Sequence, residues 1–141
     1  MSDFAIFDIA KSSMQAQTVR MNLVASNMAN IDSAASSAEE AYKAKKPVFK
    51  TVFDNAMGSA DPKQGSSHVE IDRIVESKAP PLREYAPNHP MADENGYIFR
   101  ANVNPIEEMA DMISASRSFQ DNIEVVNATK KMMTAVINMG K

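Results

Sequence analysis

The stretch RMNLVASNMAN at residues 20–30 decides the fold, because it sets three asparagines into what otherwise reads as the end of an apolar-striped helix. Asparagine is a poor helix former, since its side chain competes with the backbone for hydrogen bonds. Its amide group both donates and accepts, so it is useful where specific partners surround it. The question that this stretch raises is which groups form hydrogen bonds with Asn22, Asn27 and Asn30.

The helix that ends in this stretch is predicted to span residues 4–30. Apolar or small side chains recur in it at spacings of three and four residues, with one glutamine among them. This spacing is typical of a heptad seam, the apolar row through which two helices pair. The predicted seam residues are Phe7, Ala10, Met14, Gln17, Met21, Val24 and Met28.

A second long helix is predicted to follow Asn104 and Pro105, where asparagine can cap the helix and proline suits its first turn. It repeats the same alternation of three and four residues. Its predicted seam residues are Met109, Met112, Ser116, Phe119, Ile123, Val126, Lys130, Met133 and Ile137. Two long helices thus bracket the chain and are expected to pair in a coiled-coil-like manner.

The region between the helices reads as short strands and loops. Residues 68–77 alternate as a half-buried strand with Val69 and Ile71 facing inward. Residues 82–85 and 96–100 are predicted to be short strands. The segment around residues 48–53 fits a strand or a helix, and residues 33–37 and 56–67 are rich in turn formers and read as loops or linkers.

The expected fold class is mainly α with a small β-rich insertion. Residues 1–32 and 104–141 are predicted to form a terminal helical domain, and residues 33–103 a linker with a small β-rich outer insertion. A turn at residues 93–96 leads into the last strand.

Each helix carries a second apolar stripe on a face well away from its seam. These stripes comprise Ile9, Ala16 and Leu23 in the first helix and Val125, Met132 and Met139 in the second. A helix that is apolar on separate faces is usually enclosed by several neighbours. The stripes could dock onto the β-rich insertion of the same chain, but three short strands offer little surface, so packing between chains is favoured.

The three asparagines point in different directions on the same heptad, so they cannot all serve one pairwise contact. Asn30 is expected to end the helix, since asparagine tolerates the left-handed conformation. For Asn22 and Asn27 a role in fixing register between chains and a plain structural role both stay open.

Composition argues against several functional classes. With 15 basic and 18 acidic residues in 141, the net charge of −3 provides no field to attract nucleic acid. The lack of cysteine excludes disulfides and thiolate chemistry. No nucleophile elbow or phosphate-binding glycine loop is present, so we expect no enzyme and no cofactor.

Two acidic clusters resemble metal sites only superficially. His68, Glu70 and Asp72 would share one face of a strand, but three ligands on an exposed strand lack supporting groups, so a solvated face is the better interpretation. The acidic residues at 93–95 fit a hairpin turn better than a calcium loop. We therefore expect no metal site.

The N-terminal residues lack a basic leader before an apolar run, and no apolar stretch is long enough to span a bilayer, so neither a cleaved secretory signal nor a membrane span is expected.

Several segments resemble the bacterial flagellar axial proteins. Residues 7–33 (FDIAKSSMQAQTVRMNLVASNMANIDS) are similar to the N-terminal signature that rod, hook and hook-associated subunits share. The segments at 41–49 (AYKAKKPVF), 90–97 (PMADENGY), 102–109 (NVNPIEEM) and 116–127 (SRSFQDNIEVVN) resemble the proximal rod proteins of that family more closely. The loop at residues 56–67 is not matched, and Met28 stands where the family usually has leucine.

The resemblance implies a non-catalytic building block of the flagellar basal body. Subunits of that family leave the cytoplasm through the flagellar type III export apparatus without a cleaved leader. They then stack helically with copies of themselves and other rod subunits in the periplasmic space, with the terminal helices around the export channel. The residues expected to pack between helices or subunits are Phe7, Ile9, Met14, Met21, Asn22, Leu23, Val24, Asn27, Met28, Met109, Met112, Phe119, Ile123, Val125, Val126, Met132, Met133 and Ile137.

Overall fold

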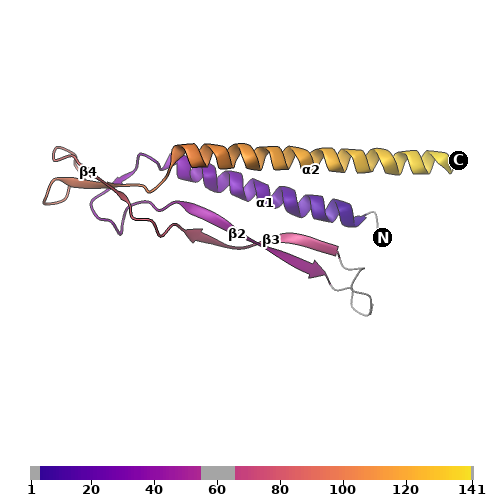
Figure 1. Ribbon diagram of the computed structural model, residues 1–141, viewed down its shortest axis with the longest axis horizontal. Helices are drawn as coiled ribbons and strands as arrows, with labels where there is room; N and C mark the ends of the chain where they lie inside the picture. The colour runs from indigo at the N-terminus through magenta and orange to yellow at the C-terminus, as the bar shows by residue number, and fades with distance from the viewer. Residues whose placement is uncertain (1–3, 55–65, 141) are drawn as a thin grey trace.

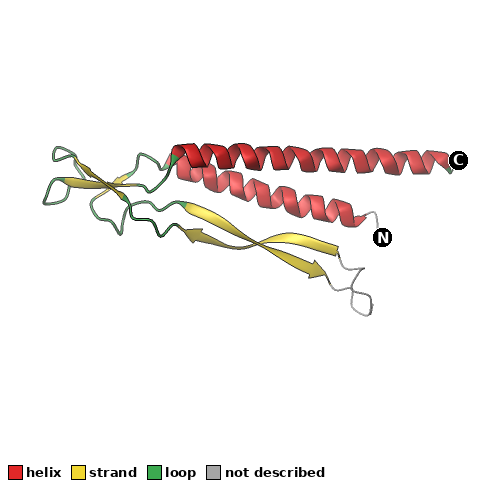
Figure 2. Cartoon of the chain, viewed as in Figure 1, coloured by secondary structure: helices red, strands yellow, loops and turns green. Residues whose placement is uncertain are grey.

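The computed structural model describes residues 4–54 and 66–140, and two long antiparallel helices dominate it (Figures 1 and 2). A β-hairpin runs along the first helix, and a small sheet lies at the end of the molecule opposite both chain termini (Figure 1). The elements in chain order are α1 (Phe4–Ala29), β1 (Ala34–Ala35), β2 (Lys45–Asp54), β3 (Ser66–Glu76), β4 (Leu82–Tyr85), β5 (Tyr97–Arg100) and α2 (Pro105–Met139). The protein is therefore helix-rich with small antiparallel sheets, as the sequence predicted.

The hairpin of β2 and β3 packs against α1. The segment around residues 48–53 is a strand, and its register with β3 breaks between Val48 and Phe49. Val69 and Ile71 of β3 are half-buried, as predicted. The backbone N–H of Val69 donates a hydrogen bond of 3.3 Å to the Ser12 hydroxyl, which ties the hairpin directly to α1.

The second sheet has the order β1-β5-β4, and all its pairs are antiparallel. The two short strands predicted at residues 82–85 and 96–100 are confirmed as β4 and β5. Before β5, the Asp93 carboxylate accepts hydrogen bonds of 2.8 Å from the N–H groups of Asn95 and Tyr97, and Gly96 adopts a φ of 79°. This is the predicted turn, and glycine suits its left-handed position.

Two loop predictions have different outcomes. Residues 33–37 were expected to be a loop or linker, but Ala34 and Ala35 pair with β5 as strand β1. Small side chains allow this close pairing, and their weak alternation hid it from the sequence pattern. The loop predicted at residues 56–67 lies mostly outside the described residues, and its last two residues, 66 and 67, belong to β3.

One end of each long helix is capped by an asparagine side chain. Asn104 caps α2 as predicted: its side-chain oxygen accepts a hydrogen bond of 3.1 Å from the Ile106 N–H, and Pro105 occupies the first turn. At the end of α1, the Asn30 amide donates to the Ser26 carbonyl oxygen at 2.8 Å. The expected left-handed conformation at Asn30 is wrong, since the only positive φ among the described residues belongs to Gly96. Asn30 ends the helix through its side chain instead.

One of the two predicted rows of α2, the one that begins at Met109, lies one residue away from the buried positions. Glu108, Ala115 and Thr129 are its buried residues, whereas Met109 and Ile123 are exposed. Of the other predicted positions, Met112, Ser116, Phe119, Val126 and Met133 are half-buried, and Lys130 and Ile137 are exposed. Because α2 is apolar on several faces, hydrophobic spacing alone could not select the row that α1 contacts.

Two polar contacts fix the antiparallel register of the helices. The Asn122 amide donates to the Ser13 hydroxyl at 2.9 Å, and Arg20 forms an ion pair of 2.6 Å with Asp111. The fully buried residues between these contacts, Ala16 and Ala115, are small, which allows close approach of the two helices.

Asn27 joins the helices to the β-rich region. Its side chain is 1% exposed, and it donates to the Lys45 carbonyl oxygen at 2.9 Å and to a Glu108 carboxylate oxygen at 3.1 Å. Its carbonyl oxygen accepts from the Lys45 N–H at 2.9 Å and from the Tyr42 hydroxyl at 3.0 Å. Both donor and both acceptor positions are thus used within the chain. The role in register between chains that the sequence left open for Asn27 is not needed to explain it.

A small apolar core lies beside this network. It consists of Ala44, Ala101 and Val103, against which Ile31 and Tyr42 pack. The Ala44 N–H donates to the Asn102 side chain at 2.8 Å, so the segment before β2 and the segment after β5 are held together.

We predict that Asn27→Ala lowers the free energy of unfolding by about 2–4 kcal/mol, because it leaves the buried Glu108 carboxylate and the Lys45 backbone without their partner. Urea unfolding measures the change. Asn22→Ala is the matched control, since Asn22 is exposed on the same helix, and its effect should stay within about 0.5 kcal/mol. Equal effects of both substitutions would contradict the assigned role of Asn27.

Candidate assembly interface

The second helix extends beyond its partner within the chain. α1 has 26 residues and α2 has 35, which correspond to lengths of about 39 Å and about 52 Å. Since Ser13 lies opposite Asn122 in an antiparallel pair, the start of α1, nine residues earlier, lies opposite residue 131. The last turns of α2 therefore project past the N-terminus of α1 (Figure 1).

The second apolar stripe of α2, which we call the outer stripe, is exposed along its length. It consists of Val125, Met132 and Met139, whose exposed fractions are 48%, 61% and 79%. Exposure rises toward the C-terminus because α1 covers less of the helix there. Within the described residues, α2 packs against α1 and against no other helix or strand.

Further large apolar side chains are exposed around α2. Besides the outer stripe they are Ile106, Met109, Ile113, Ile123, Val136 and Ile137. Nine exposed large apolar side chains on one helix are more than a surface helix of an isolated subunit needs, which is typical of interaction sites. The sequence prediction missed Ile106, Ile113 and Val136, although the spacings of four residues from Met109 to Ile113 and from Met132 to Val136 place these residues beside predicted ones.

The second stripe of α1 behaves differently. Ala16 is buried and Leu23 is half-buried, and Leu23 lines one groove together with Pro47 and Phe49 of β2. Leu23 therefore lies beside the β-hairpin of the same chain, the alternative that the sequence left open for this stripe. The hairpin reaches Leu23 because the segment around residues 48–53, for which a strand and a helix were both open, forms the ten-residue strand β2 beside β3. Ile9 remains exposed.

The structure sorts the residues predicted for packing by their exposure. Val24 and Asn27 are buried. The half-buried residues are Phe7, Met14, Met21, Leu23, Met28, Met112, Phe119, Val126 and Met133. The exposed residues are Ile9, Asn22, Met109, Ile123, Val125, Met132 and Ile137. Most buried or half-buried residues come from α1 and most exposed ones from α2. The predicted packing surface that remains exposed to solvent therefore lies mainly on α2.

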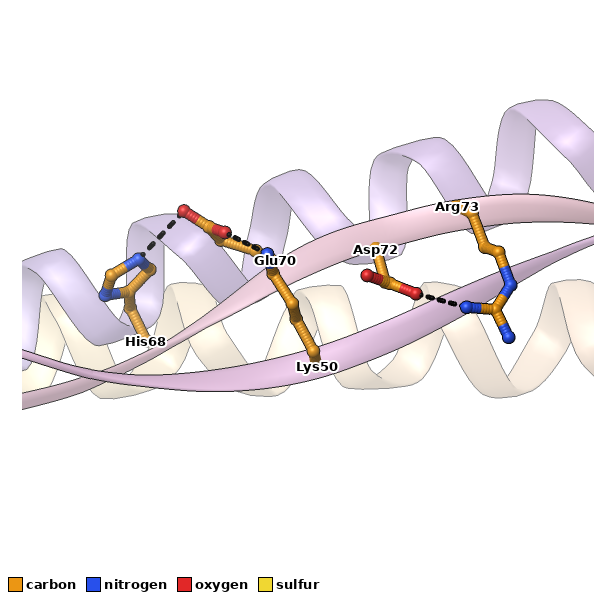
Figure 3. Close-up of polar contacts among 5 residues, drawn as sticks. All are labelled: Lys50, His68, Glu70, Asp72 and Arg73. Atoms are coloured by element: carbon orange, nitrogen blue, oxygen red, sulfur yellow. Dashed lines mark hydrogen bonds and ion pairs between the residues drawn. The ribbon is translucent and has the colours of Figure 1, made fainter.

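The hairpin carries charge pairs instead of a reactive centre (Figure 3). Glu70 contacts Lys50 at 3.1 Å and His68 at 3.3 Å, and Asp72 contacts Arg73 at 2.7 Å. The hydrogen bond from Lys50, followed by that from His68, lowers the pKa of Glu70. A carboxylate paired in this way stays ionised, which suits a solvated strand face better than proton transfer.

Residues 4–54 and 66–140 contain neither a metal cluster nor a membrane-spanning helix. No group of three or more histidine, cysteine or acidic side chains in them is placed to hold a metal ion. Neither helix, over its described length, combines the length and apolar character required to cross a bilayer.

The similar proteins are flagellar. Residues 94–139 match the family described as flagellar basal body rod FlgEFG protein C-terminal. The chain is 42% identical over 136 residues to the flagellar basal-body rod protein FlgC of Salmonella typhimurium, with 96% of both chains covered. It is 40% identical to FlgC of Yersinia enterocolitica and 30% identical to FlgC of Bacillus subtilis, in each case over the full length of both chains.

The segments that carry the resemblance meet in space at Asn27. The N-terminal signature provides Asn27 itself, residues 41–49 provide Tyr42 and Lys45, and residues 102–109 provide Glu108. These segments lie far apart in the sequence, and the hydrogen bonds at Asn27 join them into one unit. Because these relatives are at least 30% identical and are matched over nearly their whole length, the chain belongs to the FlgC family of flagellar basal-body rod proteins.

Proposed function

We propose that the chain is a structural subunit of the proximal rod of the flagellar basal body, without catalytic activity, which assembles helically with copies of itself and with other rod subunits. Relatives named flagellar basal-body rod protein support this assignment. The observation that carries it is the exposed outer stripe of α2, which needs a covering surface outside the chain.

The two helices have different tasks in this proposal. α1 is enclosed by α2 on one side and by the hairpin on another, so it serves mainly to hold the subunit together. α2 packs against α1 alone among the described elements, and its remaining faces are available to neighbours. Helices of adjacent subunits would pack on these faces in a coiled-coil-like manner, with Val125 and Met132 near the centre of the contact.

Residues 1–32 and 104–141 would form the inner, axial part of the rod around the export channel, with residues 33–103 outside it. Torque would pass from subunit to subunit through many apolar contacts and would require no chemistry. Each such contact would contribute little binding energy, but a helical array contains many of them. Contacts between different faces of neighbouring subunits can continue as an open helical filament instead of closing into a ring.

Export would precede assembly. The subunit would leave the cytoplasm through the type III export apparatus without a cleaved leader and reach the rod in the periplasmic space. The part of α2 beyond residue 131 has no helix of its own chain beside it in the described structure, and isolated helices of this length are marginal in water. Docking would complete the helix, so assembly would be coupled to ordering.

We predict that Val125→Asp prevents incorporation into basal bodies, because a carboxylate in an apolar contact loses hydration without gaining a partner. Motility and isolation of basal bodies provide the measurement, and secretion of the chain should continue. Asn127→Asp is the matched control, since Asn127 is also exposed on α2 but lies on a polar face with Lys130 and Lys131. Normal rods that contain the Val125 variant would remove the outer stripe from the interface.

We also predict that backbone amides of residues 132–139 exchange hydrogen much faster than those of residues 108–129 in the dilute chain, and that raising the protein concentration slows their exchange. The reason is that neighbours, not α1, would cover this part of α2. Hydrogen exchange followed by mass spectrometry resolves the two regions. Uniform protection along α2 in the dilute monomer would contradict this prediction. If that monomer also bound one partner at fixed stoichiometry, a stand-alone helical adaptor would be favoured instead.

A further inference from the structure

We propose that Met109, Met132 and Met139 make the unassembled subunit sensitive to peroxide, because oxidation of these thioethers to sulfoxides blocks packing on α2. The inference rests on the proposed function, since it requires α2 to be buried in the rod. The inference assigns a modification site to α2 and states that an oxidant can reach this site only before the subunit is assembled.

The methionines of this chain differ in access to solvent. Met139 and Met132 have the large exposed fractions given above, and Met109 is 54% exposed. The half-buried methionines are Met14, Met21, Met28, Met112 and Met133. Because an oxidant must reach the sulfur atom, oxidation is selective for the exposed thioethers.

The exposed thioethers lie on the surface that assembly would use. Met132 and Met139 are seven residues apart on the outer stripe, beyond the position where α1 begins. Met109 lies near the other end of α2, one turn from the exposed Ile113. Oxidation would therefore modify both ends of α2 and leave the contact between α1 and α2 intact, since Ala115 and Thr129 in that contact carry no sulfur and Met112 and Met133 are half-buried.

The chemistry is a two-electron oxygen transfer. The sulfur lone pair attacks one oxygen of hydrogen peroxide, the O–O bond breaks, a sulfur–oxygen bond forms, and water leaves after proton transfer. The thioether is oxidised and the peroxide is reduced. A flexible apolar side chain becomes a polar one, which disfavours its burial in an apolar contact unless it finds a hydrogen-bond donor. Methionine sulfoxide reductases reduce the sulfoxide back to the thioether. Burial in the rod would prevent the oxidation, because peroxide could not reach the sulfur atoms.

The first test treats the purified full-length chain with hydrogen peroxide and follows each methionine by peptide mass spectrometry. Met139, Met132 and Met109 should oxidise several-fold faster than the five half-buried methionines. Met91, which is 41% exposed but lies before β5 and outside α2, is an internal standard for an exposed thioether. Equal rates for the α2 methionines and the half-buried ones would overturn the proposal.

The second test asks whether a polar side chain at these positions blocks assembly. The variant M132Q/M139Q places an uncharged polar group of similar length where the sulfoxide would lie, and M132L/M139L keeps the positions apolar. In cells, the glutamine variant should lower incorporation into basal bodies by at least about tenfold, whereas the leucine variant should incorporate normally. M91Q is the matched control and should incorporate like the unmodified chain.

The outcomes separate this inference from the proposed function. Normal incorporation of M132Q/M139Q together with loss of incorporation for Val125→Asp would overturn the inference and leave the function standing. Normal incorporation of both variants would contradict the function as well. Circular dichroism of the glutamine variant should match that of the unmodified chain, because both positions are exposed in the described structure; a loss of helicity large enough to explain the defect would also overturn the inference.

Discussion

The length difference between the two helices is the constraint on which the rest of the structure depends. A helix that is apolar on several faces is stable in water only when those faces are covered, and α1 reaches along only part of α2. The β-hairpin does not relieve this shortage, because it packs on α1 instead. The chain thus builds one well-enclosed helix and one that remains open to partners.

Asn27 makes this division possible. Its hydrogen bonds hold the start of β2 and the first turn of α2 against the end of α1, so the β-rich region and both helices are fixed at a single buried point. A buried amide with all its partners present contributes specificity as well as stability. The rest of α2 can then project from a rigid base, and in a rod such a base would transmit force from one subunit to the next.

Sequence periodicity predicted the elements well where the pattern is local. The cap at Asn104, the strand with Val69 and Ile71 inward and the turn at Gly96 all depend on neighbouring residues, and all are confirmed. It failed where contacts join distant segments: the partners of Asn27 lie 15 to 81 residues away, so no spacing rule could reveal them. One of the two predicted rows of α2 was also wrong by one residue, because several rows of this helix are apolar. The packing of the remaining rows between subunits stays a prediction.

The most direct measurement of the central claim is an electron cryomicroscopy map of the isolated basal body, resolved well enough to place side chains of α2. The account predicts that Val125, Met132 and Met139 are buried against helices of neighbouring subunits. A map in which this row faces solvent or the open channel, with α2 covered by nothing more than its own α1, would contradict it.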